Sequence, residues 1–84
     1  MSISVKILFF AKAKELSGLK ESQITLPETV SYKQLLQDVV NKYNLKPIEK
    51  NIIIALNQEF SEADKIFKLE ESDIIAVIPP LSGG

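Results

Sequence analysis

Apolar and polar residues alternate at the start of the chain, and this alternation predicts a β-strand. Residues 3–10 carry apolar side chains at every odd position and polar ones at positions 4 and 6. A period of two is typical of a strand with one buried face. Leu8 and Phe10 add apolar side chains at even positions. We therefore expect the end of this strand to be buried on both faces.

The next segments predict a turn back toward the first strand. Residues 11–17 are rich in helix formers and stop at Gly18, which suits a left-handed helix cap, so this segment is a short helix or a loop with one helical turn. Residues 22–26 alternate again and end at Pro27, which predicts a second strand. Because only about ten residues connect the two strands, we expect an antiparallel hairpin.

A long helix is predicted over residues 31–44. Ser31 followed three residues later by Gln34 matches a capping box, and Asn44 or the break before Pro47 ends the helix. The apolar positions recur at helical spacing and form one continuous stripe. The stripe consists of Tyr32, Leu35, Leu36, Val39, Val40 and Tyr43.

The second half of the chain adds strands. Residues 52–56 are apolar and β-branched, which favours a central strand, and residues 74–78 form a last strand that the following prolines end. Residues 61–67 are mixed and polar, and we expect one more helical turn there. One helix laid across a mixed four- to five-stranded sheet is a two-layer α+β architecture. Residues 1–79 then form one domain, and residues 80–84 form a flexible C-terminal Gly-Gly tail.

Several strands carry apolar residues at both parities, although one helix covers only one face of a sheet. Examples are Ile52 with Ile53 and Ile74 with Ile75. Either loops or another protein must cover the second face, and the sequence leaves both possibilities open.

Composition removes several classes of function. The 84 residues are 45% hydrophobic and 25% charged with a net charge of −1, so no strong field attracts nucleic acid or anionic lipid. All ten basic residues are Lys, and Cys, His, Arg and Trp are absent. The chain therefore lacks a thiolate nucleophile, the commonest metal ligand and the usual bidentate phosphate reader. We expect no catalytic centre of its own, no bound metal and no permanently bound cofactor.

The N-terminal segment predicts neither a signal peptide nor a membrane anchor. No stretch approaches the roughly 18 apolar residues that span a bilayer. Lys6, Lys12 and Lys14 interrupt the first apolar run. We therefore expect a cytosolic protein that binds neither membrane nor nucleic acid.

Charged clusters offer two weaker candidate sites. Carboxylates at positions 59–64 and 70–73 suit a divalent cation, but their spacing matches no known loop and solvated turns explain them better. A nucleophilic Lys12 or Lys14 requires burial or a like charge beside it, and a solvated or ion-paired lysine is the better explanation.

The sequence ends in Gly83-Gly84 after Pro79-Pro80, and this combination suits a thin tether. Glycine lacks a Cβ and adopts almost any backbone angles, and the extended segment from Pro79 to Gly84 reaches about 20 Å. The only reactive group that it delivers is the α-carboxylate of Gly84. Because a carboxylate is a poor electrophile, other proteins must activate it, for example as an acyl-adenylate. The chain would then be a carried reagent.

Residues 5–18 (VKILFFAKAKELSG) and 78–84 (IPPLSGG) resemble those of molybdopterin synthase small subunits of the MoaD type. These proteins are ubiquitin-like sulfur carriers of the β-grasp superfamily. The resemblance extends over essentially the whole chain and implies a β-grasp fold.

The resemblance implies a chemistry for Gly84. An E1-like adenylyltransferase and sulfurtransferase would use ATP to adenylate it, and a persulfide donor would convert it to a thiocarboxylate. The large synthase subunit would then use that sulfur to convert cyclic pyranopterin monophosphate into molybdopterin for the molybdenum cofactor. Two small and two large subunits would form a heterotetramer.

The resemblance also implies contact residues. Ile78 would pack into a pocket of the partner, with Phe9, Phe10 and Phe60 as weaker docking candidates for which core packing is the alternative. The tail would line the insertion path with Gly83, Ser82, Leu81, Pro80 and Pro79.

Three alternatives stay open. The chain could carry sulfur for thiamine or for tRNA thiolation, it could be a protein modifier joined to lysines through Gly84, or it could be an interaction domain with an incidental tail. Loss of Gly84 would change nothing only in the last case.

Overall fold

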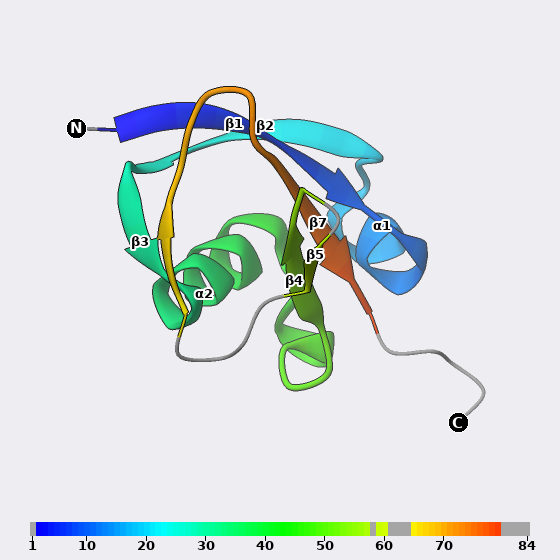
Figure 1. The fold of residues 1–84 in the computed structure, drawn as a ribbon. Coiled ribbons are helices and arrows are strands. Elements are labelled where there is room, and N and C mark those ends of the chain that lie inside the picture. The colour runs from blue at the N-terminus through cyan, green and yellow to red at the C-terminus, as the bar shows by residue number, and fades with distance from the viewer. Residues whose placement is uncertain (1, 58, 61–64, 80–84) are drawn as a thin grey trace.

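The computed structural model describes residues 2–57, 59–60 and 65–79. Helix α2 lies across one face of a sheet, and the short helix α1 lies at the far end of β1 (Figure 1). This arrangement confirms the predicted α+β architecture with one main helix. The elements in order are β1 (Ser2–Phe9), α1 (Ala11–Ser17), β2 (Glu21–Pro27), β3 (Thr29–Ser31), α2 (Tyr32–Tyr43), a 3₁₀ helix (Lys46–Ile48), β4 (Ile53–Leu56), β5 (Glu59–Phe60), β6 (Ile66–Lys68) and β7 (Ile74–Ile78).

The main sheet is mixed, with the strand order β2-β1-β7-β4-β5. Strand β1 pairs antiparallel with β2 and parallel with β7, and β4 pairs antiparallel with both β7 and β5. This topology confirms the predicted hairpin and the predicted mixed sheet of four to five strands. It also confirms that β4 lies in the interior of the sheet. The first and last strands meet in the middle of the sheet.

Strand β1 is buried on one face only. Val5, Ile7 and Phe9 are at most 2% exposed and face α2, whereas Leu8 is half-buried and Phe10 is 46% exposed. The prediction that the end of this strand is buried on both faces is therefore wrong. The reason is that α2 covers one face, and Leu8 and Phe10 have the other parity.

Helix α2 is capped at both ends. The Ser31 hydroxyl accepts a hydrogen bond from the backbone N–H of Gln34 at 3.1 Å. The Gln34 amide does not complete a reciprocal capping box, because it donates to Asp38 at 2.9 Å. Asn44 ends the helix in the left-handed conformation. The buried face of the helix consists of Tyr32, Leu35, Val39, Val40 and Tyr43.

A second, two-stranded sheet joins β3 to β6. Val30 and Phe67 lie directly opposite each other in this antiparallel pair, and both are buried. Such cross-strand apolar pairs stabilise short strands. The predicted helical turn over residues 61–67 is therefore wrong for Ile66 and Phe67, and residues 61–64 lie outside the described residues.

A hydrogen bond joins strand β4 to helix α2 at a position where β4 has no pairing partner in β5. In the described register, β5 pairs only with Ala55 and Leu56. The backbone N–H of Ile54 instead donates to the buried hydroxyl of Tyr32 at 3.0 Å. A buried N–H that would otherwise lack an acceptor is thereby satisfied.

A set of hydrogen bonds, here called the Asn57 clasp, fixes the start of β7. Asn57 is left-handed at φ 51°, its N–H donates to the carbonyl of Ile74 at 2.8 Å, and its side-chain oxygen accepts from the N–H of Ile74 at 2.9 Å. The Asn57 amide also donates to the buried carboxylate of Asp73 at 2.9 Å, and that carboxylate accepts from the N–H of Glu70 at 2.8 Å. The clasp joins the turn after β4 to the turn before β7.

Candidate functional site

The root of the C-terminal tail lies at the end of a central strand. Ile78 is the last residue of β7 and pairs with Ile53, and Val77 pairs with Phe9 on the other side. Pro79 is buried and has no N–H to extend either ladder. The rigid sheet therefore ends at Pro79, and the predicted insertion residues beyond it lie outside the described residues. These are Pro80, Leu81, Ser82, Gly83 and Gly84.

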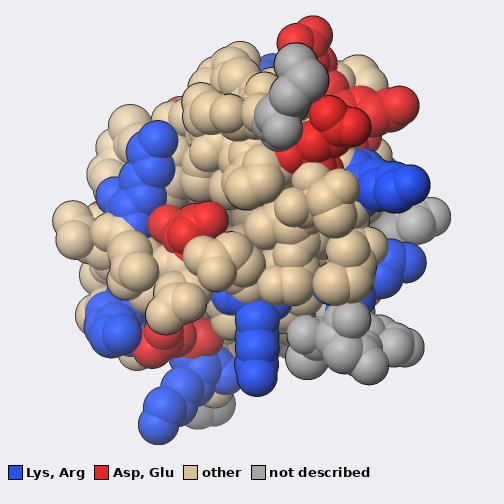
Figure 2. Space-filling model, turned by 90° about the vertical axis from the view of Figure 1, so that its left-hand side faces the viewer, with Lys and Arg blue, Asp and Glu red and all other residues tan. Residues whose placement is uncertain are grey.

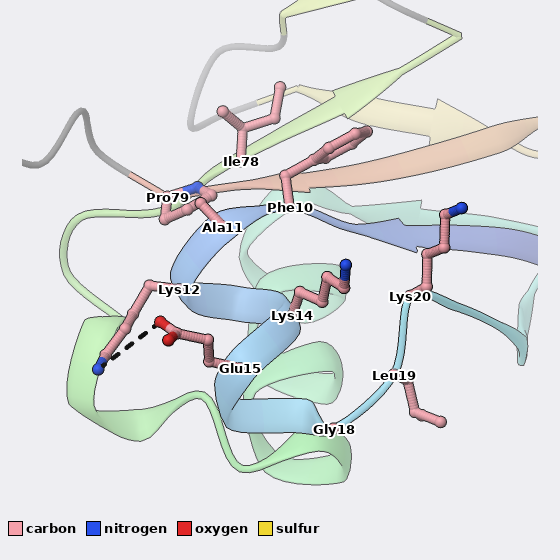
Figure 3. Close-up of a pocket in the computed structure, with 10 residues that line it drawn as sticks. All are labelled: Phe10, Ala11, Lys12, Lys14, Glu15, Gly18, Leu19, Lys20, Ile78 and Pro79. Atoms are coloured by element: carbon pink, nitrogen blue, oxygen red, sulfur yellow. Dashed lines mark ion pairs between the residues drawn. The ribbon is translucent and has the colours of Figure 1, made fainter.

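An open groove lies beside this tail root, between α1 and the end of β7 (Figure 3). The side chains of Phe10 and Ile78 point to the side of the sheet away from α1, and those of Lys14 and Lys20 extend toward Phe10 in this view. The lining residues are Phe10, Ala11, Lys12, Lys14, Glu15, Gly18, Leu19, Lys20, Ile78 and Pro79.

Two neighbouring phenylalanines have opposite environments at this groove. Phe9 is 2% exposed, and its ring centroid lies 4.7 Å from that of Tyr43 in an edge-to-face contact. The prediction that Phe9 contributes to the docking face is therefore wrong, because its parity directs it into the core. Phe10 has the opposite parity and is exposed, as the docking prediction requires. The next residue, Ala11, is left-handed at φ 48° and starts the turn into α1.

The sheet face opposite α2 stays open among the described residues. Ile53 is 41% exposed and Ile74 is 39% exposed, whereas Leu8 and Ile78 are half-buried. With Phe10 these residues share one side of the sheet, and we call this surface the open face. Exposed apolar surface of this kind is a candidate interaction site. The sequence left open whether loops or another protein cover this face. The described loops leave these side chains exposed.

Phe60 is only partly tested as a docking candidate. Its backbone belongs to β5 and pairs with Ala55. Its side chain lies outside the described residues, so its docking role stays a prediction.

The described charges offer no catalytic cluster. No group of three His, Cys, Asp or Glu residues that could hold a metal ion occurs in the described part of the chain. Figure 2 shows lysine and acidic side chains interspersed among uncharged ones on the face seen from the left of Figure 1. No helix in the described part of the chain is long and apolar enough to cross a membrane.

Sequence reasoning missed Leu19 and Lys20 as part of the groove. The left-handed Gly18, at φ 74°, turns the chain after α1 and leads into them. The sequence does contain a signal, because Gly18 is expected to cap the preceding helix. Whether the two residues after Gly18 line the groove depends on where β2 begins, and the sequence does not fix that position.

The fold is similar to those of solved ubiquitin-like proteins. One is the small archaeal modifier protein 1 from Methanosarcina acetivorans, with a TM-score of 0.72 and 26% identity over 100% of this chain and 99% of that one. Another is the complex of subunits 1 and 2 of the molybdopterin-converting factor from Helicobacter pylori, with a TM-score of 0.68 and 26% identity over 96% of this chain and 99% of that one. The β-grasp fold implied by the sequence is confirmed.

Sequence comparison extends this similarity to nearly the whole length of a relative. The chain is 42% identical over 83 residues to the molybdopterin synthase sulfur carrier subunit of Caenorhabditis briggsae, covering 98% of this chain and 99% of that relative. The model of the ThiS family matches residues 7–84, which include the end of β1, helix α1 and the tail. The chain therefore belongs to the ThiS family.

Proposed function

We propose that this chain is the sulfur carrier subunit of molybdopterin synthase. The observation that carries the proposal is its full-length similarity to the relative of that name. The fold supports it physically, because the central strand β7 ends at a buried Pro79, directly before the tail. A rigid scaffold with a glycine-ended tether suits the delivery of one terminal group into another protein's active site.

The proposed reaction begins at the α-carboxylate of Gly84. A carboxylate oxygen attacks the α-phosphate of ATP, pyrophosphate leaves, and a C-terminal acyl-adenylate forms on the E1-like activating enzyme. The terminal sulfur of a protein persulfide then attacks the acyl carbon and AMP leaves. A thiol cleaves the resulting acyl disulfide, which gives the thiocarboxylate and a disulfide on the donor. ATP is consumed by the activating enzyme, and the carrier itself holds no permanent cofactor.

The thiocarboxylate then serves the large synthase subunit. Residues 79–84 enter its active site, and the sulfur is transferred to cyclic pyranopterin monophosphate to build molybdopterin. Water hydrolyses the acyl link between carrier and substrate, and the Gly84 carboxylate is restored. The proposed assembly has two small and two large subunits. We place it in the cytosol, and we assign it no nucleic-acid or membrane partner.

Intact-mass spectrometry tests the proposal directly. The chain is incubated with ATP, the molybdopterin-pathway activating enzyme and a persulfide donor. We expect a mass increase of one oxygen-to-sulfur replacement, located at Gly84 by fragmentation. A matched control with one alanine added after Gly84 should gain no sulfur. A gain only with a thiamine-pathway or tRNA-thiolation enzyme would contradict the molybdopterin assignment.

A second candidate function is protein modification through Gly84. The similarity to an archaeal modifier protein favours it, because that protein has the same fold and is similar over its whole length. A modifier forms isopeptide bonds with lysines of other proteins, and it would appear in cells as a ladder of larger adducts. A thiocarboxylate that transfers its sulfur without such adducts supports the carrier function.

A further inference from the structure

The groove beside the tail root carries positive charge that the described residues do not neutralise. Lys12 pairs with Glu15 at 4.0 Å, and on the neighbouring strands Lys6 pairs with Glu21 at 3.5 Å. Lys14 and Lys20 form no ion pair within the described part of the chain. The groove therefore has a local excess of positive charge on a chain whose net charge is −1.

The same groove offers apolar side chains on opposite sides of these two lysines (Figure 3). Phe10 is 46% exposed and Leu19 is 40% exposed. A second, smaller hollow that contacts Phe10, Lys14 and Lys20 continues the groove toward Leu8 on the open face. A surface that combines exposed aromatic and aliphatic side chains with uncompensated cations matches a protein segment with carboxylates next to a large apolar side chain.

The position of the groove indicates which protein supplies that segment. The five residues 80–84 span at most about 17 Å when fully extended. A protein that encloses the end of the tail must therefore approach Pro79 closely, and Pro79 itself lines the groove. A solved relative of the same fold was determined as a complex of the two subunits of the molybdopterin-converting factor.

We propose that Lys14 and Lys20 bind carboxylates of the large molybdopterin synthase subunit, while Phe10 receives an apolar side chain from the same segment. This inference rests on the proposed function. It extends the docking surface from the open face, through the shared residues Phe10 and Ile78, to the α1 side of the tail root. The lysines fix the orientation of the carrier around its tail, and the apolar residues supply most of the buried area.

A charge-reversal pair tests the inference. The double variant Lys14→Glu/Lys20→Glu is compared with Lys33→Glu/Lys50→Glu, which makes the same change in net charge at exposed lysines outside the groove. Binding to the purified large subunit of the same organism is measured by titration calorimetry at low and high salt. We expect the groove variant to bind about tenfold more weakly at low salt and to lose most of the salt dependence. The control variant should bind like the parent chain.

Phe10→Ala separates the apolar contribution from the charged one. It should weaken binding while the salt dependence stays as in the parent chain, because both lysines remain. Circular dichroism verifies that each variant is folded.

The outcomes distinguish the inference from the proposed function. Equal binding and equal salt dependence of the two double variants would overturn the inference, while sulfur transfer by the parent chain would leave the function intact. Normal binding to the large subunit combined with slower thiocarboxylate formation would assign the groove to the activating enzyme and also overturn it. A parent chain that neither acquires sulfur nor binds the large subunit would refute both.

Discussion

At the scale of single residues, two left-handed positions fix turns of the main sheet, one beside the tail root and one at the start of β7. Ala11 at φ 48° redirects the chain from β1 into α1, and Asn57 at φ 51° closes the turn that holds the start of β7. Such angles disfavour a side chain with a Cβ, and Asn tolerates them better than Ala. At Asn57 both side-chain atoms are also used in hydrogen bonds.

Two substitutions at Asn57 separate the contribution of its side chain from that of its backbone. Asn57→Gly keeps the left-handed angle available and removes the hydrogen bonds to Asp73 and Ile74, so we expect a loss of about 1–2 kcal/mol in the free energy of unfolding. Asn57→Ala should lose about 1 kcal/mol more, because its Cβ is strained at this angle. Urea unfolding measures both values. Equal stability of the two variants would show that the backbone angle contributes nothing.

Phe9 and Phe10 show that the alternation of apolar and polar residues in the sequence predicts which side of the sheet each side chain faces. Period-two alternation placed Phe9 on the same side as Val5 and Ile7, and the structure confirms that side as the core. The resemblance nevertheless suggested Phe9 as a docking residue. The parity of β1 was the better guide, because one helix can cover only one face.

At the scale of elements, the predictable segments were those with a repeated local signal. Helix α2 has a stripe of apolar residues and a cap, and β7 was predicted with the bounds that the structure shows. Strands β3 and β6 have three residues each, too few for a period to emerge. Their pairing depends on Val30 meeting Phe67 across 37 positions of sequence, which no local pattern contains. The sequence does not reveal the groove for the same reason, since the groove combines α1, the two residues before β2 and the end of β7.

The bond between α2 and β4 gives a test at this scale. Tyr32→Phe keeps the ring in the core and removes the hydroxyl that accepts from Ile54. We expect a loss of about 1–3 kcal/mol in the free energy of unfolding, because a buried N–H is left without an acceptor. Hydrogen exchange of the Ile54 amide should also accelerate. Tyr43→Phe is the matched control, because the Tyr43 hydroxyl makes only longer bonds of 3.3 and 3.5 Å.

At the scale of the whole molecule, one face of the sheet is packed against α2 and the other face is exposed. One face and α2 form the core, and the open face exposes apolar side chains beside the tail root. A small domain buries only a modest apolar core and is marginally stable. Apolar side chains that stay exposed on its surface therefore need an explanation other than folding stability. A protein that covers this face while the tail enters it provides one.

A charge introduced on the open face tests that explanation. Ile78→Lys should weaken binding to the large subunit at least tenfold, because a lysine there must be desolvated on docking. Ile66→Lys is the control, since Ile66 is 59% exposed but lies on β6 in the other sheet. Both variants should keep the circular dichroism spectrum of the parent chain. Unaltered binding of Ile78→Lys would remove this residue from the docking surface.

The central position of β7 has a consequence for how the molecule is made. Its neighbours β1 and β4 are not paired with each other, so the main sheet stays divided until residues 74–78 have left the ribosome. Such non-local pairing makes folding a late event in synthesis. A nascent chain that stops short of β7 would keep its apolar strands unassembled and be open to proteolysis. Truncated chains that lack β7, the strand that carries the tail, would thereby be removed before they compete with complete carriers.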